Sequence, residues 1–115
     1  MREPEDLLDP LPAGCGVARF LVLLDGPWAT LIVRELLAGP KRFSDLREQL
    51  PGISANTLTR RLRRFEAYGV VERTTYAQVP PRVEYELTPL GQQLTPVLAA
   101  MARWALSVPE PVHTP

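Results

Sequence analysis

Apolar positions recur every three or four residues along the first third of the chain, which is the spacing of one helix face. One such stripe spans residues 17–24, and a second helix is expected over residues 28–38. Pro27 suits the first position of that second helix, because its missing N–H would have no partner there. Gly39-Pro40 then ends the helix, since proline cannot continue it.

Two further helices follow, and each has a serine at its expected start. Ser44 is expected to cap a short helix over residues 45–50. Ser54 is expected to cap a longer helix over residues 55–68, because its hydroxyl can accept a hydrogen bond from an unpaired amide of the first turn. Gly69 stands where a left-handed residue commonly ends a helix.

The pattern then changes to alternation of apolar and polar residues, which is typical of half-buried strands. Strands are expected over residues 70–75 and 82–87. Pro80-Pro81 belongs at the tip of the hairpin between them, because proline cannot donate a ladder hydrogen bond. Residues 42–43 are expected to form a short extended link ahead of the third helix.

A final helix is expected over residues 89–106, capped by Thr88. Pro96 should kink it or restart it after Thr95. The order of elements is that of a winged helix-turn-helix domain, a mostly α fold with a small β-hairpin wing (α+β).

A length of 115 residues suits one domain. We expect that domain over residues 15–106. Residues 1–14 are expected to form an extended N-terminal arm, and the Pro-rich residues 107–115 a flexible tail.

The net charge of zero conceals an uneven distribution of charge. Residues 34–73 hold nine basic and five acidic side chains, whereas residues 1–33 hold two and five and residues 74–115 hold two and three. A positive central block indicates a local anionic partner. The alternative is a charged face that is merely solvated.

The helix expected over residues 55–68 has an apolar and a basic side. Leu58, Leu62 and Phe65 recur at the spacing of a core face. A side roughly 120° away is expected to carry Thr57, Arg60, Arg61 and Arg64. Arginine donors suit guanine O6 and N7, and an amide suits adenine N6 and N7 in the DNA major groove. The expected base-reading residues are Ser54, Asn56, Thr57, Arg60 and Arg61.

Contacts to the DNA backbone, or from the wing (residues 76–82), are expected from Lys41, Arg42, Arg63, Arg64 and Arg82. Arg82 follows two stiff prolines, so its guanidinium could reach a narrow minor groove or a phosphate. The alternative is that Arg82 pairs with Glu84 or stays in water.

The sequence offers few residues that could serve in catalysis or in metal binding. The chain has a single cysteine and a single histidine, His113. No metal cluster, no phosphate-cradling glycine-rich loop and no catalytic dyad is expected, and no cofactor. The longest apolar run, residues 20–24, is far below the ~20 residues of a membrane span. We therefore expect a cytoplasmic protein with no membrane partner.

Several segments together resemble the HxlR-type winged-helix regulators of bacteria: GPW (residues 26–28), LPGIS (50–54), GVVER (69–73) and VPPRVEYELTPLG (79–91). The last segment is the most specific of them, and the resemblance covers about residues 15–106. It implies a dimeric transcription factor that binds a palindromic operator in double-stranded DNA through its recognition helix and wing. The resemblance also implies that the protein acts at the nucleoid, in the cytoplasm of a bacterium. An effector is expected, but the sequence does not indicate its chemical class.

The last helix carries more apolar surface than a small core needs. With the first helix, it is expected to form a two-fold interface made of Val17, Phe20, Leu94, Val97, Leu98, Met101, Trp104 and Ala105. The alternative is that these side chains pack within one subunit.

Cys15 lies at the start of the first helix, a position that favours a reactive thiolate. Some members of the family that the chain resembles sense oxidants through a cysteine near this point, so Cys15 is a candidate redox sensor. The sequence departs from the family pattern at Gly16, where proline is common, and at Pro27, where lysine is common. The alternative is that Cys15 is simply a small buried apolar residue.

Three functions are therefore compared. The first is a sequence-specific DNA-binding transcriptional regulator without catalysis, modulated by thiol oxidation or a small effector. The second is a winged-helix protein–protein interaction module, which would show little affinity for any duplex. The third, a small enzyme, lacks the residues for a catalytic site.

Overall fold

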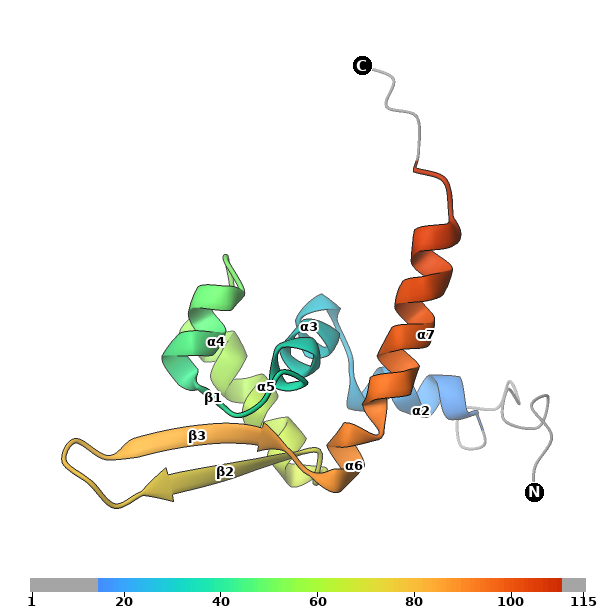
Figure 1. Ribbon diagram of the computed structural model, residues 1–115. Coiled ribbons are helices and arrows are strands. Elements are labelled where there is room, and N and C mark those ends of the chain that lie inside the picture. The colour runs from blue at the N-terminus through green and yellow to red at the C-terminus, as the bar shows by residue number, and fades with distance from the viewer. Residues whose placement is uncertain (1–14, 111–115) are drawn as a thin grey trace.

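The structure is a computed structural model that describes residues 15–110, and these residues form helices around a three-stranded sheet (Figure 1). The helices are α2 (Gly16–Leu23), α3 (Pro27–Leu36), α4 (Phe43–Gln49), α5 (Ala55–Ala67), α6 (Pro89–Gln92) and α7 (Leu94–Ser107). The strands are β1 (Lys41–Arg42), β2 (Val71–Tyr76) and β3 (Arg82–Leu87). The predicted mostly α fold with a hairpin wing is confirmed. The predicted arm and residues 111–115 of the predicted tail lie outside the described residues.

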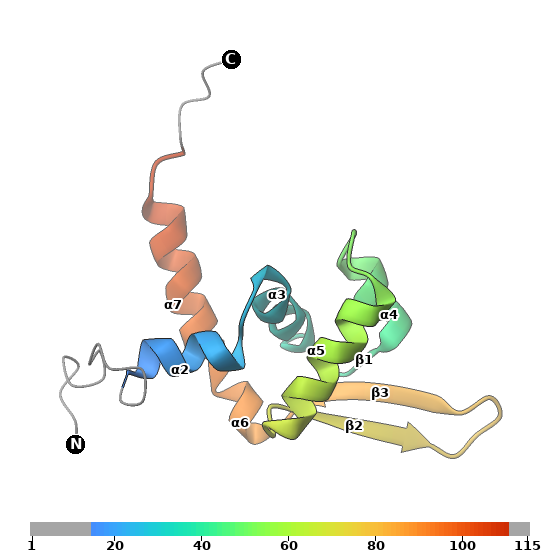
Figure 2. The same cartoon turned by 180° about the vertical axis from the view of Figure 1, so that it is seen from behind.

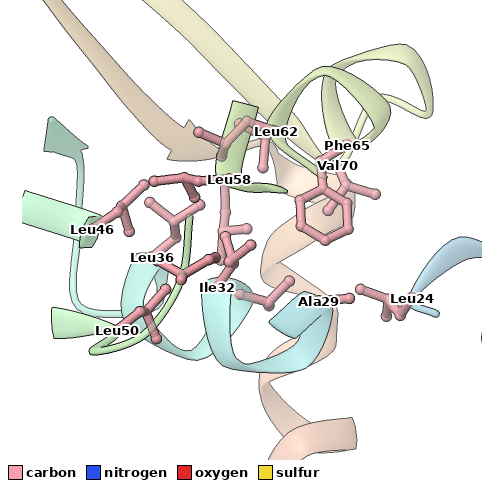
Figure 3. Close-up of a cluster of buried hydrophobic side chains, with 14 residues drawn as sticks. Leu24, Ala29, Ile32, Leu36, Leu46, Leu50, Leu58, Leu62, Phe65 and Val70 are labelled. Carbon is pink, nitrogen blue, oxygen red and sulfur yellow. The ribbon is translucent and has the colours of Figure 1, made fainter. Parts of the chain in front are cut away.

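The core lies where α3, α4 and α5 converge (Figure 3). Its largest fully buried side chains include Ile32 and Leu36 of α3, Leu46 of α4, and Leu58 and Phe65 of α5. Burial of each such side chain stabilises the folded state by roughly 1.5–3 kcal/mol. The core therefore fixes α5 on the body of the domain by one side only.

The sequence predicts four helix starts from a capping side chain or from proline. The structure confirms three of them. Pro27 occupies the first turn of α3. Ser54 Oγ accepts a hydrogen bond from the Thr57 amide at 3.0 Å, and Thr88 Oγ1 accepts one from the Gly91 amide at 3.1 Å. Gly69 adopts φ +75°, as expected of a left-handed terminator.

The prediction that Ser44 caps the third helix is wrong. Helix α4 begins two residues earlier than expected, at Phe43, with Arg42 as its N-cap residue. The carboxylate of Asp45 accepts a hydrogen bond from the Arg42 amide at 3.1 Å. An acidic side chain three residues into a helix can thus secure its start in place of a cap hydroxyl.

The sheet has the strand order β1-β3-β2, with both pairs antiparallel. Lys41 lies opposite Tyr85, and Arg42 lies opposite Glu84. The predicted extended link at residues 42–43 is therefore displaced by one residue. Its extended part is β1, whereas Phe43 already belongs to α4.

The last predicted helix is divided. Helix α6 ends at Gln92, and α7 starts again at Leu94. Pro96 falls in the first turn of α7, where an amide hydrogen would have no helical partner, so no kink is needed there. The break comes earlier than the predicted position after Thr95.

Both views show that α7 rises away from the body, with α2 across its base, while the β2–β3 hairpin extends to the other side (Figures 1 and 2). Within residues 15–110, no single helix is long and apolar enough to cross a membrane. Taken together, α2 and α3 meet that test by length and composition alone, although they are bent by 79° at their junction.

Candidate nucleic-acid interface

Helix α5 lies across the hairpin, and the view from behind shows no other element in front of it (Figure 2). Its core side chains Leu58 and Leu62 are fully buried. On the opposite side Asn56, Arg60 and Arg63 are exposed, at positions i, i+4 and i+7. We call these three residues the outer stripe. An amide and two guanidinium groups thus project together from a rigidly anchored helix.

A second stripe of α5 faces helix α2. Arg61 forms an ion pair with Asp25, which lies in the turn between α2 and α3. Arg64 donates a hydrogen bond from Nη2 to the carbonyl oxygen of Val22 at 2.6 Å. The Arg64 guanidinium also lies over the ring of Tyr68, 5.5 Å from its centroid. Both arginines are therefore bound within the chain.

The four predicted basic-side residues share one side of α5, but their surroundings differ. Arg60 is exposed on the outer stripe and Thr57 is only half-exposed, whereas Arg61 contacts the turn after α2 and Arg64 contacts α2 itself. The predicted grouping overlooked Asp25, because this acidic partner is 36 residues away in the sequence. The positions of Asn56 and Arg63 could have been found from the sequence, since they share the spacing of Arg60.

Two of the predicted base-reading residues take part in the cap of α5. Ser54 Oγ accepts a hydrogen bond from the Thr57 amide and donates one to Thr57 Oγ1 at 2.9 Å. Ser54 is nevertheless exposed at the start of the helix. The hydroxyl groups of these residues thus lie at the end of α5 that enters the groove in helix-turn-helix proteins.

The wing loop, residues 77–81, joins β2 to β3 at the far end of the hairpin. Arg82 lies over the ring of Tyr76, with its guanidinium carbon 4.3 Å from the ring centroid. Its Nε is 3.5 Å from the Glu84 carboxylate. The alternative pairing with Glu84 is thus present, and the stacking on Tyr76 holds the guanidinium close to the loop.

An open notch of about 360 Å³ lies between α5 and the hairpin. It is lined by Thr59, Arg63, Glu66, Arg73 and Tyr85. Arg73 was not among the predicted site residues. Its position follows from strand alternation, since Arg73 lies two residues after the buried Val71 and opposite Tyr85.

The remaining predicted cations lie on β1, at the edge of the sheet beside β3. Arg42 is exposed, and Lys41 is half-buried. Within residues 15–110 no group of three or more His, Cys, Asp or Glu side chains could hold a metal ion.

Comparison with known proteins identifies this arrangement. Residues 23–112 match the HxlR-like helix-turn-helix family. The chain belongs to that family. It is therefore a helix-turn-helix, DNA-binding transcriptional regulator and not an enzyme, and this finding supports that function over the alternative of a protein–protein interaction module.

Individual relatives of this HxlR-like chain agree. An uncharacterised HTH-type transcriptional regulator of Synechocystis sp., sll1512, is 46% identical over 76% of this chain, which spans 64% of that protein. The HTH-type regulator YybR of Bacillus subtilis is 40% identical over 85% of this chain and 78% of its own length. The solved structure of the redox regulator HypR in its oxidised form has a TM-score of 0.77 and 38% identity, covering 84% of this chain and all of that one.

The HxlR-like chain also exposes apolar side chains along α2 and α7, which we call the α2–α7 surface. Its most exposed members are Val17, Leu21, Val22, Val97, Met101, Trp104 and Leu106. Trp104 is 72% exposed. Between the two helices lies a groove of about 420 Å³, lined in part by Phe20, Leu23 and Leu94.

The predicted interface residues divide into two groups. Phe20, Leu94 and Leu98 are partly buried and pack against the core of their own chain. The others remain exposed: Val17, Val97, Met101, Trp104 and Ala105. The expectation of intramolecular packing therefore holds for the first group only.

Cys15 is the N-cap residue of α2. Its Sγ accepts a hydrogen bond from the Ala18 amide at 3.4 Å, and the residue is partly exposed. It is thus neither fully buried nor freely projecting.

Proposed function

We propose that this regulator binds a two-fold symmetric operator as a homodimer, with α5 in the major groove and the wing at the adjacent minor groove or backbone. The outer stripe carries this proposal, because it is the part of α5 that the core leaves free. We place the protein at the nucleoid of a bacterial cytoplasm, where such operators lie.

Base recognition is assigned to the N-terminal half of α5. The amide of Asn56 can donate to and accept from adenine, and Arg60 can donate two hydrogen bonds to guanine. Ser54 and Thr57 flank them at the cap and can contact a base edge or a phosphate. Arg61 is left out of this set, because its guanidinium is paired with Asp25.

Contacts to the phosphate backbone are assigned to cations around α5. Arg63 and Arg73 line the notch beside the hairpin, and Arg82 lies at the wing loop. Lys41 and Arg42 continue this surface along β1. Arg64 lies near the end of α5, where it can reach a phosphate only by leaving Val22. Such contacts position the helix and make binding depend on salt.

The dimer is assigned to the α2–α7 surface. A contiguous apolar patch with side chains as large as Trp104 and Met101 is uncommon on the surface of a monomer. A two-fold axis would place two copies of α5 about 34–36 Å apart, so that both enter successive major grooves on one side of the DNA.

Control by thiol oxidation is a second proposal, favoured by the similarity to the redox regulator HypR. Cys15 caps α2, one of the two helices of the proposed dimer surface. Oxidation of its sulfur would therefore alter the start of that helix and, with it, the dimer surface. We expect hypochlorite or peroxide to change operator binding of the native protein and not of a Cys15→Ser variant. Equal responses of the two proteins would contradict redox control and leave DNA binding intact.

DNA binding itself is tested by selection of bound duplexes from a random library. A labelled duplex carrying the enriched sequence is then titrated by fluorescence anisotropy across a range of salt concentrations. We expect a palindromic consensus, tighter binding than to a scrambled duplex, and steep weakening with salt. Failure to enrich any sequence would contradict the proposal.

A further inference from the structure

Within residues 15–110, Asp25 is the acidic side chain that forms an ion pair with α5 from outside that helix. We propose that Asp25 sets the DNA affinity of this regulator by holding Arg61 against the turn between α2 and α3, away from the phosphate backbone. The inference rests on the proposed function of α5 and adds a positioning residue that lies outside α5.

The contact encloses the guanidinium of Arg61. The Arg61 side chain is only 17% exposed, although it belongs to a helix whose neighbouring arginines Arg60 and Arg63 are exposed. Its Nη1 pairs with the carboxylate of Asp25. A cation and an anion in contact present little net charge to a third ion, so Arg61 contributes little to phosphate attraction while the pair is intact.

Gly26 shapes the same contact. It adopts φ +80°, and a Cβ atom there would lie 2.9 Å from Arg61 Nη2. Glycine therefore lets the turn come close enough for the guanidinium to lie against its backbone.

A neighbouring arginine of α5 also contacts this region, through the backbone of α2. Arg64 binds the carbonyl oxygen of Val22, three residues before Asp25. Phe20 and Leu23 of α2 pack against the core, and these polar contacts add to the attachment of its C-terminal end. Arg61 and Arg64 together join α5 to the C-terminal end of α2 and to the turn that follows it.

Release of Arg61 should have a measurable charge effect. In Asp25→Asn the guanidinium loses its partner, and an unpaired, largely enclosed cation is unfavourable. Arg61 is then expected to swing out and add one phosphate contact per subunit. Each added contact steepens the dependence of log affinity on log salt by about 0.9.

The test compares variants on the enriched duplex by anisotropy between low and physiological salt. We expect Asp25→Asn to bind about threefold to tenfold more tightly at low salt, with a slope steeper by about 0.9 per subunit. Glu35→Gln is the matched control: it changes the charge equally and frees Arg34 of α3, which lines a groove with Met101 of α7. Its slope is expected to equal that of the native protein.

Two further variants separate release of Arg61 from disturbance of the fold. Arg61→Gln alone is expected to keep the native slope, and adding it to Asp25→Asn should abolish the gain. Native-like affinity of Asp25→Asn, or a shallower slope in Arg61→Gln, would overturn the inference and leave the proposed function standing. No binding by the native protein to any duplex would overturn both.

Discussion

At the scale of single residues, the arginines of α5 differ in the groups that they contact. Arg60 and Arg61 are adjacent in the sequence, but one is exposed and the other is paired with Asp25. This difference arises because consecutive helical residues point about 100° apart. Neighbouring cations of one helix can therefore have different tasks, one at a base edge and the other within the fold.

Replacement of Arg60 by alanine tests its base contact. We expect Arg60→Ala to weaken binding to the operator by about 1–3 kcal/mol and to relax selection at one base pair of each half-site. The fold should be unaffected, because the side chain is exposed. Competition anisotropy with single-base operator variants measures both effects.

Arg103→Ala is the control for that measurement. It removes the same charge from an exposed position on α7, outside the proposed DNA-binding surface. An equal loss of affinity in the two variants, without change in base preference, would assign Arg60 to bulk charge and not to base recognition.

The apolar residues of the site helix were predictable from the sequence, but the partner of Arg61 was not. The spacing of Leu58, Leu62 and Phe65 determines which side is buried, and the structure buries all three. The pairing of Arg61 depends on where the α2–α3 turn lies in space, which local periodicity does not contain. Side-chain spacing therefore predicts the core of a helix better than the partners of its charges.

At the scale of elements, caps decide where the helices of the helix-turn-helix begin. Helix α5 uses a serine hydroxyl, whereas α4 uses the carboxylate of Asp45 on the Arg42 amide. Ser44 and Ser54 look alike in the sequence, but only Ser54 caps a helix. The difference comes from β1, whose pairing with β3 fixes the chain up to Arg42 and lets α4 start directly after it.

Alanine substitution of the two serines tests this difference. We expect Ser54→Ala to lower the free energy of unfolding by about 1 kcal/mol, because the Thr57 amide loses its hydrogen-bond acceptor. Ser44→Ala is the matched control and should change it by no more than a few tenths of that amount. Urea unfolding followed by circular dichroism measures both. Equal effects of the two substitutions would contradict the assignment of caps.

At the scale of the whole molecule, two surfaces of different character lie on different elements. The outer stripe and the wing are basic and polar, whereas the α2–α7 surface is apolar and extends along a projecting helix (Figure 1). The surplus of apolar residues on the last helix was visible in the sequence. Pro96 predicts a break in that helix after Thr95, but the break lies at Gln93, because proline fits into the first turn of α7.

Introduction of a charge into the α2–α7 surface tests the proposed dimer. We expect Trp104→Glu to shift the protein to monomer in sedimentation equilibrium, because a carboxylate cannot be buried there without a partner. Affinity for the full palindrome should fall, while the weak affinity for a single half-site is kept. Val79→Glu, on the fully exposed wing loop, should keep the native mass. A dimer that survives Trp104→Glu would place the interface elsewhere.

The exposure of Trp104 also makes its intrinsic fluorescence a measure of dimer formation. The chain has two tryptophans, and Trp28 is already packed partly against the core, whereas Trp104 stands in water on the described chain. If subunits meet through α7, the indole of Trp104 passes from a wet to an apolar environment. Intrinsic emission should then move to shorter wavelength as protein concentration rises, so that assembly is followed without any dye.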